Sequence, residues 1–278
     1  MKRSLLATVL AGTSLLSTQE SQAQTAPIYR EVFGNNTAGN ALLSTVGWSG
    51  AWGPTAIDSG TPSPNNFGIS NAGGSPNNLD NINAGGPSLS LANGLAFTSG
   101  ASASTNNWIA YTTGYTVNTA ANSIQDISFY AGNAANGTFG IPGYRIAVQI
   151  DGSWYASTAV LANTVAVPLA SNFASLAQQL TFTWTTAASA WDNLTFTPGN
   201  SLVLGSTLTS PLPGDSITAF GLYSDQEPGT SSAGNATRRF DTFQIDATPI
   251  VVPEPSSLAL AALSGFGMLM GFRRSRKA

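Results

Sequence analysis

The stretch that decides the fold lies in the middle of the chain and reads Tyr144-Arg145-Ile146-Ala147-Val148-Gln149-Ile150-Asp151-Gly152-Ser153-Trp154-Tyr155-Ala156-Ser157. Asp151-Gly152 separates two runs that are rich in β-branched and aromatic residues, which pleated, half-buried strands favour. A two-residue hairpin turn needs a positive φ at both central positions, and Asp-Gly supplies this readily. The stretch therefore predicts an antiparallel β-hairpin.

Similar short runs recur on both sides of the hairpin between clusters of Gly, Asn, Pro and Ser, and no segment has a sustained helical period. The pattern predicts strands near residues 28–33, 88–92, 95–99, 108–117, 123–130, 144–151, 153–157, 179–185, 193–197, 216–223 and 239–245. Such a series predicts an all-β, antiparallel β-sandwich of the jelly-roll or concanavalin-like type. The alternative, a β-helix, requires a fixed repeat that the sequence lacks.

Residues 34–87 are dense in Asn, Gly, Ser and Pro and predict a long irregular segment. Trp48 and Trp52 lie there in a Gly-rich stretch. Aromatic rings can stack on sugar rings. Trp48 and Trp52 are therefore candidates for binding an uncharged glycan. The alternative is packing in the core, which we expect for Trp108, Trp154, Trp184 and Trp191.

The composition excludes several kinds of chemistry. The 278 residues are 42% hydrophobic and 8% charged, and Cys and His are both absent. Without Cys, disulfides, zinc-thiolate sites and thiol nucleophiles are excluded. Without His, a Ser-His-Asp triad and His-ligated metals are excluded.

The N-terminus has the pattern of a secretory signal peptide. Lys2 and Arg3 precede an apolar run over residues 5–16, and Ser21-Gln22-Ala23 places small residues before a cleavage site after Ala23. We therefore expect a signal peptide with an apolar signal helix over residues 1–23, followed by a β-sandwich domain over residues 24–252.

A second apolar segment covers residues 258–272 and leads directly into four basic residues, Arg273, Arg274, Arg276 and Lys277. As a helix it spans roughly 22 Å, and two preceding serines bring it to the lower limit for crossing a membrane. The basic residues act as a stop that stays cytoplasmic. We expect a sorting segment over residues 253–278 with a short apolar transmembrane helix.

Without the two ends, the charge balance becomes acidic. Residues 24–252 contain 11 acidic and four basic residues, which gives 4 − 11 = −7, and no Lys. A domain with this balance is not expected to bind nucleic acid or anionic membrane surfaces.

Pro253-Glu254-Pro255 precedes the apolar segment and the basic tail. The three parts together resemble the PEP-CTERM sorting signal of Gram-negative bacteria. The resemblance implies processing by an exosortase, a membrane enzyme similar to a transpeptidase. It also implies a transient anchor in the inner membrane before delivery to the cell surface or extracellular space of bacteria that produce exopolysaccharide.

The opening segment Tyr29-Arg30-Glu31-Val32-Phe33 and the closing segment over residues 239–245 match in type. They resemble the terminal strands of carbohydrate-binding jelly rolls, which pair with each other and hold a structural calcium with an acid near each end. The resemblance implies Glu31 and Asp241 as calcium ligands. The alternative is an ion pair of Glu31 with Arg30 or Arg239, and we expect no other cofactor.

Asp225 and Glu227 are the closest pair of acids, and positions i and i+2 of a strand share a face. Glycoside hydrolysis uses two neighbouring carboxyl groups, but Pro228-Gly229 follows and favours a solvated turn. We assign no catalytic residue and predict a non-enzymatic, exported surface or matrix protein associated with exopolysaccharide. The alternatives are a calcium-stabilised carbohydrate-binding module, and a glycoside hydrolase or lyase that uses Asp225 and Glu227.

Overall fold

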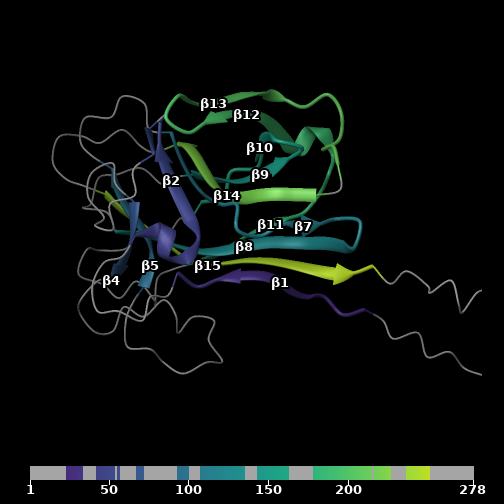
Figure 1. Cartoon of the computed structure of the whole chain (residues 1–278), viewed down its shortest axis with the longest axis horizontal. Helices are drawn as coiled ribbons and strands as arrows, with labels where there is room; N and C mark the ends of the chain where they lie inside the picture. The colour runs from purple at the N-terminus through teal and green to yellow at the C-terminus, as the bar shows by residue number, and fades with distance from the viewer. Residues whose placement is uncertain are drawn as a thin grey trace, which may run out of the picture.

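The chain forms two antiparallel β-sheets that lie as layers on each other (Figure 1). The computed structural model describes residues 23–33, 42–53, 55–56, 67–71, 93–99, 107–134, 143–162, 178–214, 216–226 and 236–250. The predicted all-β antiparallel sandwich is confirmed. The expected signal helix, C-terminal apolar helix and strand at 88–92 lie outside the described residues.

The first sheet has the strand order β11-β8-β15-β5-β4, and β1 also pairs with β15. Its strands are β1 (Ala26–Glu31), β4 (Phe67–Asn71), β5 (Asn93–Ser99), β8 (Asn122–Ala134), β11 (Gln178–Thr183) and β15 (Ala236–Pro249). The antiparallel register sets Glu31 opposite Phe243, so the first and last strands lie side by side (Figure 1). The expected pairing of the terminal strands is therefore confirmed.

The second sheet has the order β13-β12-β10-β9-β14-β6-β2-β3, and β7 also pairs with β14. Its strands are β2 (Trp48–Trp52), β3 (Thr55–Ala56), β6 (Trp108–Thr112), β7 (Val117–Asn118), β9 (Gly143–Ile150), β10 (Ser153–Ser157), β12 (Trp191–Thr197), β13 (Ser201–Thr207) and β14 (Ser216–Gln226). Two short 3-10 helices, η1 (Leu43–Val46) and η3 (Ala188–Ala190), complete the described elements.

The predicted hairpin is formed by β9 and β10. Ile150 pairs with Ser153, and the two residues between them turn the chain with φ values of 51° at Asp151 and 78° at Gly152. Positive φ at both central positions is the geometry that an Asp-Gly turn supplies.

The expectation of an irregular segment over residues 34–87 is wrong for its described parts, which contain η1, β2, β3 and β4. Strand β2 pairs with β6 over its whole length, from Trp48 opposite Thr112 to Trp52 opposite Trp108. Gly and Ser have a low local preference for strands. Here this is outweighed by pairing with β6, which satisfies the backbone hydrogen-bonding groups of β2.

Aromatic side chains fill the space between the layers. Phe220 of β14 stacks on Phe243 of β15, with ring centroids 5.7 Å apart and planes within 6°. Trp48 packs edge-on against Phe243 at 5.3 Å. Trp108 and Trp191 are fully buried, as predicted. Offset and edge-on aromatic pairs add stability beyond their buried area.

A smaller apolar cluster lies on the opposite face of the second sheet. Tyr111, Trp154 and Phe196 contact one another with centroid distances between 5.3 and 5.5 Å. The amide of Asn107, which precedes β6, donates a 3.4 Å hydrogen bond to the carbonyl of Leu202 in the edge strand β13. The second sheet therefore curls until β13 approaches the start of β6. None of the helices in the described ranges is long and apolar enough to cross a membrane.

Candidate functional site

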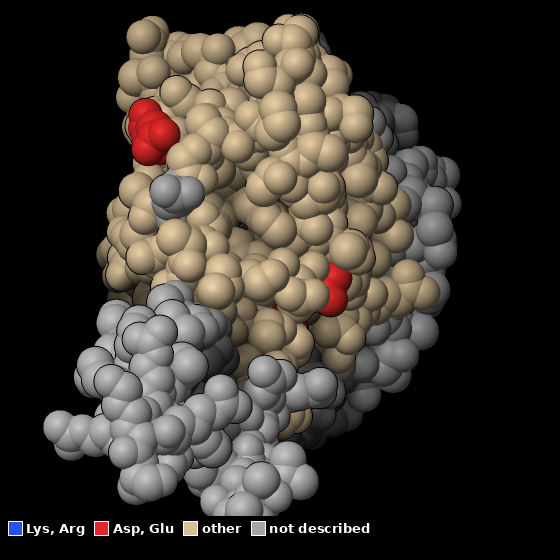
Figure 2. Space-filling model, turned by 90° about the vertical axis from the view of Figure 1, so that its right-hand side faces the viewer, with Lys and Arg blue, Asp and Glu red and all other residues tan. Residues whose placement is uncertain are grey.

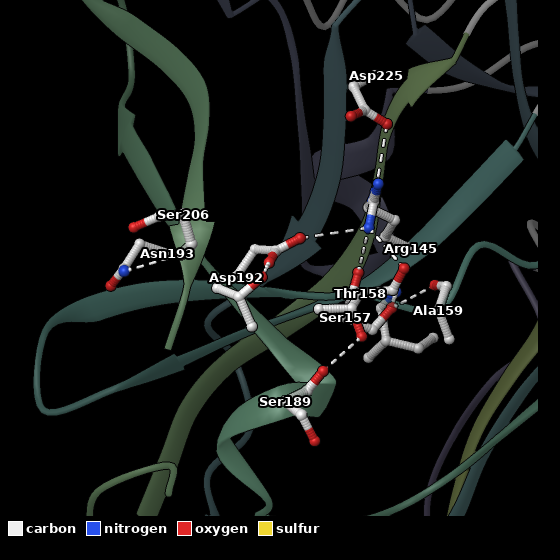
Figure 3. Close-up of polar contacts among 11 residues, drawn as sticks. Arg145, Ser157, Thr158, Ala159, Ser189, Asp192, Asn193, Ser206 and Asp225 are labelled. Carbon is white, nitrogen blue, oxygen red and sulfur yellow. Dashed lines mark hydrogen bonds and ion pairs between the residues drawn. The ribbon is translucent and has the colours of Figure 1, made fainter. Parts of the chain in front are cut away.

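Arg145 of β9 is the centre of a buried polar network (Figure 3). It is the third residue of β9 and lies on the same face as Ala147, which belongs to the smaller cluster. Nη1 donates to the carbonyl oxygens of Ser157 at 2.7 Å and Thr158 at 2.9 Å. Nη1 also lies 3.5 Å from Oδ2 of Asp192, and Nε lies 3.3 Å from Oδ1 of Asp225. Arg145, which is 9% exposed, is thus paired with two carboxylates.

Two further residues, Thr207 of β13 and Tyr223 of β14, adjoin this network. Oδ1 of Asp192 accepts a 2.7 Å hydrogen bond from the hydroxyl of Thr207, so β12 is tied to the end of β13. Tyr223 of β14 lies opposite Arg145 in the register and is fully buried. Burial raises the pKa of the Tyr223 hydroxyl; the Asp225 carboxylate adds to the rise, and Arg145 opposes it. Within the described residues, this hydroxyl has no hydrogen-bond partner.

A groove of about 380 Å³ adjoins the network where β10, β12, the end of β13 and the following segment 208–213 meet. Its hydrogen-bonding side chains are Asn193, Ser206, Thr207, Thr209 and Ser210, and its ring-bearing side chains are Tyr155, Pro211 and Pro213. No lining residue carries a charge. The groove is therefore a polar but uncharged site beside a charged, buried scaffold.

A β-bulge shapes this groove. Asp192 pairs with Thr207 and Leu194 pairs with Leu204, so Gly205 and Ser206 together face the single residue Asn193. A Cβ atom at Gly205 would lie 3.2 Å from both the Cβ and the carbonyl oxygen of Asn193, so the glycine permits this close approach. The amide of Asn193 donates to the carbonyl of Ser206 at 3.0 Å.

The two tryptophans predicted to bind a glycan lie in strand β2 and not in a loop. Trp48 is 1% exposed, and its Nε1 donates to the hydroxyl of Tyr29 at 2.9 Å. Its ring is a core element and does not offer the open face that stacking on a sugar requires. The side chain of Trp52 is outside the described part of the structure.

The predicted calcium ligands lie on the paired terminal strands. Oε1 of Glu31 accepts a 2.6 Å hydrogen bond from the backbone N–H of Phe33, and burial raises the pKa of the Glu31 carboxyl group. Asp241 is fully buried, and its Oδ1 accepts a 2.6 Å hydrogen bond from the N–H of Thr242. Among the residues that the structure places, no group of three or more acidic side chains is arranged to hold a metal ion.

The predicted acid pair is only half described. Asp225 belongs to strand β14, where a turn was expected, and its carboxylate is engaged by Arg145. Glu227, the sorting motif Pro253-Glu254-Pro255 and the basic stop lie outside the described residues.

Sequence reasoning missed Arg145, Asp192 and the groove. An arginine between apolar neighbours in a strand was the available signal, because buried cations require partners.

The fold and the groove define a β-sandwich domain with a small polar surface site. Comparison with known families matches residues 251–277 to the PEP-CTERM protein-sorting motif, which agrees with the sequence prediction. The chain thus combines a PEP-CTERM sorting motif with a β domain. The motif supports export to the cell envelope or surface and implies processing by an exosortase-type enzyme. A search of curated proteins gives no match.

Proposed function

We propose that the β-sandwich is a non-enzymatic domain that associates with uncharged exopolysaccharide at the cell surface or in the extracellular matrix. The observation that carries this proposal is the uncharged, hydroxyl-rich groove beside β12 and β13. The sorting motif supports it, because the motif favours export to the cell envelope or surface, where a domain can meet an extracellular polymer.

The surface charge supports the same environment. Figure 2 shows one face of the molecule on which the described residues include isolated acidic groups and no Lys or Arg. Binding to polyanions relies on clustered basic side chains. An uncharged polymer, which is recognised by hydrogen bonds and ring contacts, suits this face better than an acidic one.

The position of Asp225 supports a non-enzymatic domain. The general acid of a glycosidase must exchange a proton with the substrate, and its pKa is raised for that task. Asp225 instead accepts a hydrogen bond from the buried guanidinium of Arg145, so this carboxylate is engaged within the fold.

Cosedimentation tests this function. The full chain, purified from the producing cells, is mixed with their exopolysaccharide, with alginate as an acidic polymer and with DNA. We expect the protein to sediment with a neutral exopolysaccharide at low and at high salt, and to release no reducing ends. Binding only to alginate or DNA, lost at high salt, would contradict the proposal, as would the release of reducing ends.

A further inference from the structure

The lining of the groove matches the surface of a neutral sugar. A sugar ring carries hydroxyl groups around its rim and C–H groups on its faces. Asn193, Thr209 and Ser210 supply exposed hydrogen-bonding groups, and Pro211 supplies an exposed ring surface, whereas Tyr155 is largely buried beneath the groove. A uronate or phosphate would instead call for Arg or Lys, the side chains that pair with such anions. None lines this groove.

The walls of the groove are fixed before any ligand arrives. Tyr155 and Asn193 lie directly opposite each other on β10 and β12, so their side chains are neighbours on one face. The amide of Asn193 is held by the carbonyl of Ser206. A site whose side chains are already positioned loses less conformational entropy on binding.

The buried network fixes the opposite wall. Thr207 lines the groove and donates to Asp192. Asp192 in turn pairs with Arg145 (Figure 3). Arg145 is anchored by the carbonyl oxygens of Ser157, the last residue of β10, and of Thr158, which follows it. The end of β13 is therefore linked to β9 by side chains, in addition to the bulged ladder that pairs it with β12.

We propose that this groove is a binding site for one or two residues of a neutral polysaccharide, an inference that rests on the proposed association with exopolysaccharide. The volume of about 380 Å³ is in the range of small-molecule sites, near its lower end. Asn193, Ser206, Thr209 and Ser210 are exposed, so a polymer can reach the groove without an end having to enter a closed cavity.

Calorimetric titration of the full chain tests the site with defined probes. The neutral probes are cellotetraose, maltotetraose and mannotetraose, and tetragalacturonate is the acidic one. The variants are Asn193→Ala combined with Thr209→Ala, which removes hydrogen bonds, and Thr209→Trp, which fills the groove. Thr195→Ala is the matched control, because Thr195 is exposed on the same strand two residues beyond Asn193 and does not line the groove.

We expect at least one neutral tetrasaccharide to bind, and the double variant to weaken its binding about 25-fold, since each of the two lost hydrogen bonds costs roughly a factor of five. Thr209→Trp should abolish binding, and Thr195→Ala should leave it unchanged. Unchanged melting temperatures show that the variants are folded.

Equal binding by wild type and Thr209→Trp would overturn the groove as the site but would leave the proposed function standing. Preference for tetragalacturonate would overturn the neutral class of ligand. If wild type binds none of the probes, the site inference fails. The cosedimentation experiment uses the cells' own polymer and none of these tetrasaccharide probes. It therefore decides the proposed function separately.

Discussion

The hydroxyl of Thr207 lies 2.7 Å from Oδ1 of Asp192, and this hydrogen bond connects the lining of the groove to the buried Arg145. Asp192 therefore has two partners on different strands. Removing its carboxylate leaves a buried cation short of one counter-charge and frees the end of β13. The network thus couples the stability of the second sheet to the shape of the groove.

Asp192→Ala should lower the free energy of unfolding by about 2 kcal/mol, because it removes the more buried of the two carboxylates that pair with Arg145 and the acceptor of the Thr207 hydroxyl. Asp225→Ala, the matched control, should cost about 1 kcal/mol, because its side chain is 23% exposed against 11% for Asp192. Urea denaturation of both variants measures the difference. Equal losses of unfolding free energy in the two variants would show that the burial of the carboxylate does not determine how much each ion pair stabilises the fold.

Tyr223→Phe should leave the free energy of unfolding unchanged or raise it by up to about 1 kcal/mol. The substitution keeps the buried ring and removes a hydroxyl that has no partner among the described residues. Urea denaturation provides the measurement, and Tyr29→Phe is the control, since the Tyr29 hydroxyl accepts a hydrogen bond from Trp48. A loss of more than about 1 kcal/mol for Tyr223→Phe would reveal a partner such as a buried water.

Glu31→Gln should stabilise the protein at neutral pH. Because burial raises the pKa of Glu31 in the folded state, the stability that this group contributes is present below its unfolded pKa and is lost as the pH rises through the folded pKa. Above that point, wild type must hold a partly desolvated charge that Gln lacks.

The gain from Glu31→Gln should therefore shrink when urea denaturation is repeated below the usual pKa of 4.5. A variant that is less stable than wild type at neutral pH would mean that the charge is stabilising, as a bound cation or an Arg partner would make it.

The calcium hypothesis for Glu31 and Asp241 makes a separate prediction. An ion that binds only the folded state at a hundredfold excess over its Kd stabilises by about 2.7 kcal/mol. Chelation should then lower the melting temperature by roughly 5–10 °C for a domain of this size, and Glu31→Gln should remove this effect. An unchanged melting curve would contradict calcium binding. The role of the two carboxylates would then be to accept the backbone hydrogen bonds from Phe33 and Thr242.

The sequence was sufficient to predict the local features of the fold. Asp151-Gly152 predicted the hairpin because the turn depends only on two residues and their flanks. The likeness of the terminal segments predicted that β1 and β15 pair. Strand β2 was missed, since its Gly and Ser residues form a strand only through pairing with β6.

The groove depends on contacts that no local pattern encodes. Arg145 and Asp192 are 47 positions apart in the sequence. Their side chains come together because β9 and β12 both pair with β10 in the second sheet. The bulge opposite Asn193 has one local signal, Gly205 within an apolar strand. That signal can be used only after β13 is recognised, and β13 was not among the predicted strands.

The distribution of the full chain in the producing cells tests the central claim most directly. Immunoblots of the inner membrane, the surface-bound matrix and the medium are compared between cells that make exopolysaccharide and a strain that makes none. We predict that the protein is held in the matrix of the first strain and released into the medium by the second. An identical distribution in both strains would contradict association with the polysaccharide.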